Sequence, residues 1–125
     1  MCGRYQRRSD KQRIAEAFSL GNVDGLSLEL DAPNHNVTPQ TMQPVVIWDE
    51  HFGMRTLQMM FWRFLPPFCT DPKTFKLSTV NASALNILTS GLWKESFLRR
   101  RCLIPVDTFI EWQIDGKRKL PWVMR

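Results

Sequence analysis

The residue with the clearest reactive chemistry is Cys2, which follows the initiator methionine in the opening sequence MCGRY. Aminopeptidases commonly remove a methionine that precedes so small a residue. Removal of Met1 would leave an α-amine beside a thiol, and the amine is partly neutral at physiological pH because its reference pKa is about 7.7–8.0. Such a 1,2-aminothiol turns an aldehyde first into an imine and then into a thiazolidine ring. The sequence therefore predicts an aldehyde trap, and the alternative is a small side chain buried on a first strand.

Two short helices and an extended N-terminus are expected around this residue. Residues 1–6 have the character of a short extended segment. Ser9 is typical of a helix N-cap, and we expect that helix to end at Gly21. A second helix is predicted over residues 92–100, LWKESFLRR, whereas residues 22–41 are expected to be mostly loop.

The middle of the chain predicts a β-hairpin and one further short strand. PVVIW (44–48) and MRTLQMMFW (54–62) have strand character and flank the glycine-containing loop DEHFG. LSTVNA (77–82) is short and rich in β-branched residues, so we expect Asn81 at or just past the end of a strand.

The strongest predicted strand is CLIPVDTFIEWQI (102–114). Its alternation places Glu111 on the same face as Phe109. Asp-Gly at 115–116 is a hairpin turn signal, and LPWVM (120–124) is expected to begin the returning strand. Together these elements predict one α+β domain over residues 1–125, with a mostly antiparallel, barrel-like sheet and a few short helices. We expect it to be truncated at its C-terminus, because no closing strand follows.

Charge and cysteine usage narrow the class of protein. The chain carries 17 Lys+Arg against 12 Asp+Glu, a net charge of +5, and its basic residues gather at the two ends. If these basic residues merged in space, they would attract phosphates, and the alternative is an ordinary solvated surface.

The chain has three cysteines without a CxxC pair and only two histidines, which predicts no metal site. With no apolar stretch long enough to span a membrane, we expect a cytoplasmic protein, or a nuclear one in a eukaryote.

Five segments occur in an order that resembles the SOS response-associated peptidase (SRAP) family, whose members are also called abasic site processing proteins. They are MCGRY, HNVTP (35–39), the Trp62 segment, VNA (80–82) and RRCLIPVDTFIEW (100–112). The resemblance implies that Cys2, freed of Met1, links covalently to the ring-opened aldehyde of an abasic site in single-stranded DNA, in the DNA damage response. We also expect a monomer with no cofactor, no metal and no membrane partner.

The same resemblance assigns roles to further residues. Asn81 would position the opened sugar and Glu111 would serve proton transfers, a use that fits a carboxylate among apolar neighbours. Arg4 would contact a phosphate beside the lesion, and Phe68 would stack against bases. Without the family, Glu111 is equally consistent with pairing to a surface arginine, and Phe68 with a core aromatic under a long loop.

Two alternative functions remain open from the sequence. The chain could be a thiol autopeptidase limited to removing Met1, or a non-catalytic remnant that binds single-stranded DNA. Family members continue for about as many residues again, with a histidine that neither His35 nor His51 matches. We therefore expect this chain to be the N-terminal portion of an SRAP-like domain.

Overall fold

The computed structural model describes residues 3–21, 23, 30 and 32–125. Strands dominate this part of the chain, and every pairing between them is antiparallel. The predicted α+β class is therefore confirmed. In chain order the elements are β1 (Tyr5–Arg7), α1 (Lys11–Phe18), β2 (Asn34–Val37), β3 (Met42–Asp49), β4 (Met54–Phe61), α2 (Lys94–Arg99), β5 (Thr108–Asp115) and β6 (Arg118–Met124).

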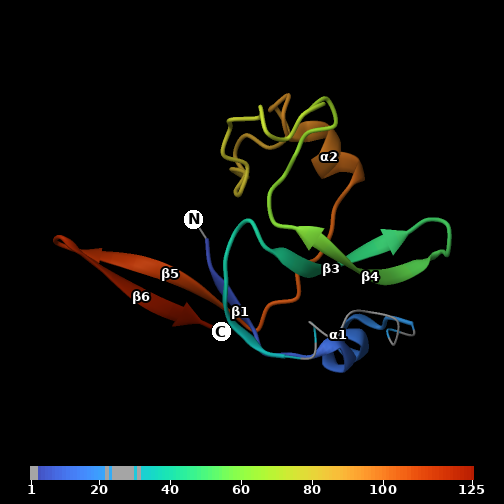
Figure 1. Ribbon diagram of the computed structural model, residues 1–125, viewed down its shortest axis with the longest axis horizontal. Coiled ribbons are helices and arrows are strands. Elements are labelled where there is room, and N and C mark those ends of the chain that lie inside the picture. Colours follow the sequence, from blue (N-terminus) through green and yellow to red (C-terminus); the bar gives the residue numbers. More distant parts are fainter. Residues whose placement is uncertain (1–2, 22, 24–29, 31) are drawn as a thin grey trace.

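The described strands form two sheets that do not close into a barrel. One has the order β2-β1-β5-β6, and the other is the β3–β4 hairpin. A single bridge joins β3 to the segment before β5: Val46 and Leu103 exchange N–H···O bonds of 2.8 and 2.9 Å. Figure 1 shows the β5–β6 hairpin extending as an arm on the left, away from α1 and from the β3–β4 hairpin.

The core lies where α1 packs on the β3–β4 hairpin. Ile14, Leu30, Val46 and Leu57 form its fully buried centre. Phe18, Leu20 and Met59 pack around it and are partly buried. Burying one such aliphatic side chain contributes about 1.5–3 kcal/mol, so this small cluster anchors the helix to the hairpin.

Helix α1 begins and ends one or two residues away from the predicted caps. Asp10, not Ser9, is the N-cap: its Oδ1 accepts from the Arg13 N–H at 2.9 Å. Ser9 has another partner, described below. Ser19, not Gly21, ends the helix with a left-handed φ of 52°. The prediction of Ser9 and Gly21 as caps was wrong. At the N-terminus either of two neighbouring polar residues, Ser9 or Asp10, could cap the helix, and tertiary contacts decided between them.

Both predicted hairpins are present. β3 and β4 pair over their full lengths around a turn in which Gly53 has φ 61°. β5 and β6 pair from Asp115↔Arg118 outward, and the turn places Gly116 at φ 58°. A glycine with positive φ at the first central position suits a two-residue type II′ turn, the class whose twist matches the strands. Helix α2 also forms within its predicted range.

Three strand predictions were wrong in extent. LSTVNA (77–82) forms no strand, so Asn81 lies in coil. The strand expected over 102–114 begins only at Thr108. Before it, Leu103 makes an isolated bridge with Val46 and the Asp107 N–H donates to the Gln6 carbonyl at 3.0 Å, but these bonds do not continue as a ladder. Conversely, β2 lies in a region expected to be loop; pairing with β1 creates it despite its polar sequence NHNV.

Candidate functional site

The cysteine on which the predicted chemistry rests, Cys2, lies outside the described residues, and the site is built from its neighbours. β1 pairs with β5 in the register Tyr5↔Phe109 and Gln6↔Thr108. The Ile110 N–H donates to the Arg4 carbonyl at 2.9 Å, which continues this pairing toward the N-terminus. One further step in the same register sets Gly3 opposite Glu111.

Arg4 is held by an aromatic ring on the neighbouring strand. Its guanidinium carbon lies 5.3 Å from the centroid of the Trp112 ring, within the range of a cation–π contact. Trp112 is two residues beyond Ile110, so Arg4 reaches diagonally across one face of the sheet. This partner was missed by sequence reasoning, because it follows from the β1–β5 register and not from any local motif.

Arg4 and Glu111 lie on opposite faces of the four-stranded sheet. Successive side chains alternate, so Arg4, Ile110 and Trp112 share one face, and Tyr5 shares the other with Glu111. Both Arg4 and Glu111 are half-buried. The structure brings these two predicted site residues onto adjacent strands without placing their side chains together.

Tyr5 fastens the Glu111 face of the sheet to the end of β4. Its ring lies 5.3 Å from the Trp62 ring at a tilt of 44°, and its hydroxyl donates to Gln43 Oε1 at 3.4 Å. Burial raises the pKa of Tyr5 to about 12, and the nearby Arg7 charge opposes that shift only in part. The neutral phenol is therefore the form that packs here. The family-like tryptophan, Trp62, thus lies against the strand that leads to Cys2.

Asn81 follows a pair of hydrogen bonds between Thr79 and Phe64 in the coil between β4 and α2. Thr79 is almost fully buried and donates through Oγ1 to the Phe64 carbonyl at 2.5 Å, while the Phe64 N–H donates back to Thr79 O at 3.2 Å. The Phe64 ring also packs 4.5 Å from Trp93. Asn81, two residues on, is exposed. Its backbone is thus anchored nearby, and its predicted role beside Cys2 stays a prediction.

The coil that carries Phe68 is also held by Arg63. Arg63 donates to the Phe75 carbonyl at 2.5 Å, and its guanidinium carbon lies 6.0 Å from the centroid of that ring. Phe68 itself is 66% exposed, so the alternative reading of it as a core aromatic is wrong. An exposed ring is available for stacking, but contact with bases remains a prediction.

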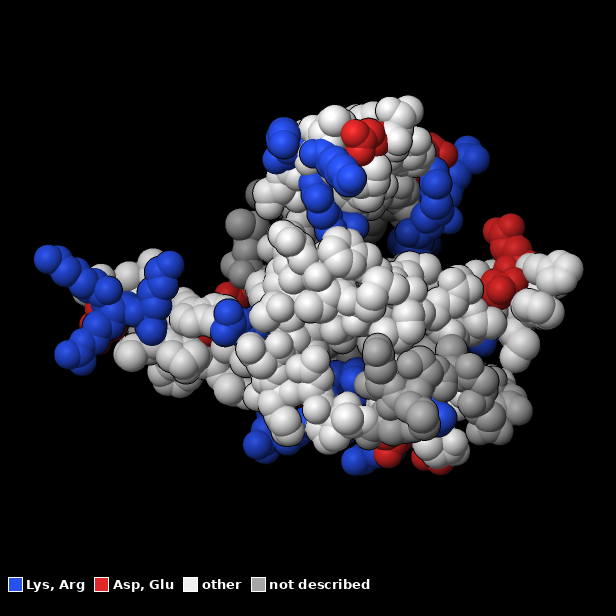
Figure 2. All heavy atoms as spheres, in the orientation of Figure 1, with Lys and Arg blue, Asp and Glu red and all other residues white. Residues whose placement is uncertain are grey.

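The basic residues of the N-terminus do not form one surface patch. Arg7 is buried and donates to the backbone carbonyls of Ser9, Leu30 and Ala32 at 3.0–3.2 Å. It therefore ties β1 to the start of the β2 region and cannot contact phosphate. Figure 2 shows other Lys and Arg side chains gathered at the tip of the β5–β6 arm and on the part of the molecule around α2.

The two histidines occupy exposed positions, one on the strand next to β1 and one in the β3–β4 turn. His35 is on β2, where a surface or loop position was expected, and His51 is in the β3–β4 turn, against the ring of Phe52. Within residues 3–21, 23, 30 and 32–125, no group of three His, Cys, Asp or Glu side chains converges as a metal site. No helix in that same part of the chain is long and apolar enough to cross a membrane.

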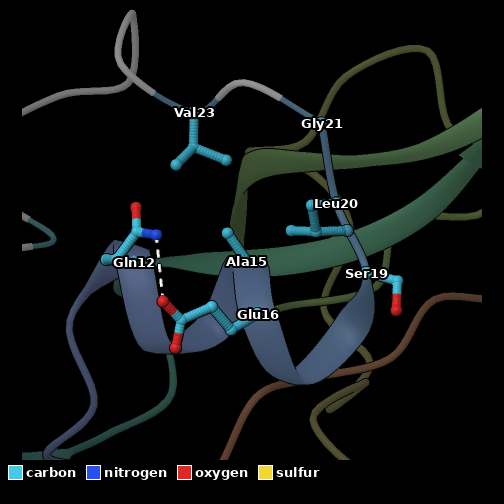
Figure 3. A pocket seen from close by; sticks show the side chains of 7 residues that line it. All are labelled: Gln12, Ala15, Glu16, Ser19, Leu20, Gly21 and Val23. Carbon is cyan, nitrogen blue, oxygen red and sulfur yellow. Dashed lines mark hydrogen bonds between the residues drawn. The ribbon is translucent and has the colours of Figure 1, made fainter.

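A hollow in the described surface lies beside α1, away from the residues above. It measures about 340 Å³ and is open to solvent. Its walls come from Gln12, Ala15, Glu16, Ser19, Leu20, Gly21 and Val23. Figure 3 shows that its one carboxylate, Glu16, accepts a hydrogen bond from Gln12 at 3.1 Å. Because the one ionisable group that lines this hollow is already hydrogen-bonded, the hollow does not indicate a catalytic site.

Comparison with known proteins identifies the family. The chain matches the SOS response associated peptidase (SRAP) family over residues 1–125. It is 32% identical over 124 residues to the abasic site processing protein YoqW of Bacillus subtilis (strain 168), covering 97% of this chain and 52% of that relative. It is 29% identical over 99 residues to the abasic site processing protein HMCES of Xenopus tropicalis, covering 72% of this chain and 30% of the relative.

A yeast relative extends the similarity across kingdoms. The abasic site processing protein YMR114C of Saccharomyces cerevisiae is 26% identical over 98 residues. The chain spans about half the length of the Bacillus relatives that it matches. The match of the whole chain to one family, together with an opening strand that pairs beside the Glu-Trp strand, shows that this protein belongs to the SRAP family.

Proposed function

We propose that this chain, after removal of Met1, uses Cys2 to form a covalent link with the aldehyde of an abasic site in single-stranded DNA. The β1–β5 pairing supports the proposal most directly, because it sets the backbone of Arg4 beside Ile110, the neighbour of Glu111, at the described end nearest to Cys2. The names of the SRAP relatives, abasic site processing proteins, support the same assignment.

The chemistry needs only the residues named and balances as follows. The neutral α-amine of Cys2 adds to the aldehyde carbon, and the resulting carbinolamine loses one water to give an imine. The thiol then adds to the imine carbon, forming a C–S bond, and the proton of the thiol passes to the nitrogen. Glu111 acts as the acid that protonates the departing hydroxyl and as the base that accepts the proton of the thiol.

The remaining site residues serve to bind the DNA. Arg4, held over Trp112, contacts a phosphate next to the lesion, and Asn81 hydrogen-bonds the opened sugar. Phe68, whose ring is largely exposed, stacks on a base. The phosphate contact and the stacking carry no base-specific information, which suits a protein that must act at a lesion in any sequence.

The test is the mass of the intact protein before and after incubation with single-stranded DNA that contains an abasic site. The expected masses are the protein without Met1, and then that protein plus DNA minus one water. Cys2→Ala and Cys2→Ser should give no adduct. The matched control is the double variant Cys69→Ser, Cys102→Ser, which removes the two described free thiols and should crosslink at the wild-type rate.

The same experiment separates the two alternative functions. A protein that loses Met1 but forms no adduct would fit an autopeptidase if Cys2→Ala retained the methionine. A protein that binds intact and abasic single-stranded DNA equally, with no adduct, would be a non-catalytic DNA-binding member of the family. Either result would overturn the proposal.

A further inference from the structure

A tryptophan that the proposed chemistry does not use lies directly opposite Glu111. In the β5–β6 hairpin the register pairs Glu111 with Trp122. Residues directly opposite in an antiparallel pair have Cβ atoms about 4.5–5.5 Å apart and point to the same face. Trp122 is 58% exposed, so much of its ring is open to contact.

The surroundings of Trp122 on that face are apolar and open. Phe109 and Met124, the next pair toward β1, are 39% and 38% exposed. They lie between Trp122 and Tyr5. At Tyr5, the contact with the Trp62 ring begins to cover this face of the sheet. The face therefore presents exposed apolar side chains, two of them aromatic, that start beside Glu111 and continue toward the core.

The charge at the other end of the arm indicates what this surface accommodates. Lys117, Arg118 and Lys119 surround the β5–β6 turn against a single carboxylate, Asp115. By alternation Arg118 shares the face of Trp122, four residues along β6, which is about 13 Å at 3.3 Å per residue. Figure 2 shows this basic group at the tip of the arm. A flat apolar ring followed by cations complements a ligand with unpaired bases on an anionic backbone.

We propose that Trp122 stacks on the nucleobase next to the abasic site, and so holds the lesion against Glu111. This inference rests on the proposed function, since it places the lesion at Cys2 and Glu111. A missing base leaves its neighbour without a stacking partner on one side, and an indole ring is a sequence-tolerant replacement. Trp122 is thus a positioning residue for the reaction.

Binding is measured first with single-stranded DNA that carries a tetrahydrofuran abasic analogue, which cannot crosslink, and 2-aminopurine as the flanking base on one side or the other. Quenching of the 2-aminopurine fluorescence on one side is expected for the wild type and not for Trp122→Ala. The affinity of Trp122→Ala should fall about tenfold, the order expected for the loss of one stacked base. The salt dependence should keep its slope, because stacking releases no counterions.

Three further variants make the result specific. Trp122→Phe, which keeps an aromatic face, should retain most of the affinity and the quenching. Trp122→Leu, which keeps an apolar side chain of substantial size, should behave like Trp122→Ala. Trp48→Ala is the matched control, because Trp48 on β3 is 62% exposed but is not paired with β5. It should bind as the wild type does.

The outcomes distinguish this inference from the function on which it rests. Wild type that fails to crosslink to a true abasic site overturns the proposed function. Wild type that crosslinks, with Trp122→Ala no different from Trp48→Ala in binding and quenching, overturns the stacking role alone. If Trp122→Leu binds as well as Trp122→Phe, the site requires an apolar cover such as a polypeptide and not a base, and the inference is wrong.

Discussion

Ser9 and Asp107, 98 residues apart in sequence, are joined by two hydrogen bonds. The Ser9 N–H donates to Asp107 Oδ2 at 3.0 Å, and the Ser9 hydroxyl donates to Oδ1 at 2.8 Å. The Arg8 N–H adds a third bond to Oδ2 at 2.6 Å. One carboxylate therefore fixes the end of β1 to the start of β5, and with them the strand pair that carries Arg4 and Glu111.

Replacing Asp107 should destabilise the protein in a pH-dependent way. Burial alone would raise the pKa of Asp107, but the hydrogen bonds from Ser9 and Arg8 outweigh it and lower the pKa below its usual 3.8. The ionised form is thus favoured by folding. Its contribution is present above about pH 4, the unfolded pKa, and is lost as the pH falls through the lower folded value.

We expect Asp107→Ala to lower the free energy of unfolding at pH 7 by about 1–3 kcal/mol, since it leaves three donors without a partner. Denaturant titrations at pH 7 and pH 3 measure this loss, which should shrink at the lower pH. Asp115→Ala, in the exposed β5–β6 turn, is the control. An equal loss for both variants, or a pH-independent loss for Asp107→Ala, would contradict the account.

Glu111 and Asn81 should affect the crosslinking rate far more than stability. Glu111→Gln keeps the shape of the side chain but removes its ability to transfer a proton, which is worth roughly 10²–10⁴-fold in rate. Asn81→Ala should slow the reaction while melting within about 0.5 kcal/mol of the wild type, as exposed substitutions usually do. Gel-shift time courses and thermal melts measure the two effects. A variant that simply unfolds would show a structural role for that residue.

Arg4 should contribute one phosphate contact to DNA binding. Each cation that neutralises a phosphate on a single strand adds about 0.7 to the slope of log affinity against log salt. Arg4→Ala is therefore expected to flatten the slope by about that amount, as measured by fluorescence anisotropy with undamaged single-stranded DNA. Arg13→Ala, on the exposed side of α1, provides the control. An unchanged slope in Arg4→Ala would mean that Arg4 serves only to pack on Trp112.

Pro121 should protect the outer edge of β6 from pairing with other chains. The Ile110 N–H points to β1, so the backbone N–H of Trp112, two residues on, also points to β1. The backbone nitrogen of its partner, Pro121, therefore faces the outer edge of β6, away from β5. Proline cannot donate a hydrogen bond at that edge. Pro121→Thr should restore a donor and increase light scattering at high protein concentration. Val123→Thr, at the next outward position, should not, and equal scattering by both variants would show that Pro121 has no such role.

The elements predicted correctly are those with a complete local signal. The β3–β4 hairpin, α2 and the β5–β6 turn each carry their own periodicity and turn residues, so neighbours in sequence were enough. The LSTVNA segment has strand-like residues, but Thr79 bonds to Phe64 and not to a neighbouring strand. β2 is the opposite case. Its polar sequence does not indicate a strand, and its pairing with β1 creates one.

The sequence named candidate site residues but could not predict how they are arranged. Resemblance to the family named Arg4, Asn81 and Glu111 with no knowledge of the sheet. The opposite faces of Arg4 and Glu111 follow only from the register Tyr5↔Phe109, which joins strands about 100 residues apart. The burial of Arg7, one of the basic residues near the N-terminus, likewise depends on carbonyls more than 20 residues along the chain.

The pairing of β1 with β5 also sets an order of events during synthesis. The N-terminus emerges from the ribosome first, whereas its partner strand is made about 100 residues later. At 5–20 residues per second this interval lasts on the order of 5–20 s. Throughout it β1 has no β5 with which to pair, and only β2, made earlier, can pair with it. The long-range register thus delays completion of the four-stranded sheet until β5 and β6 have been made.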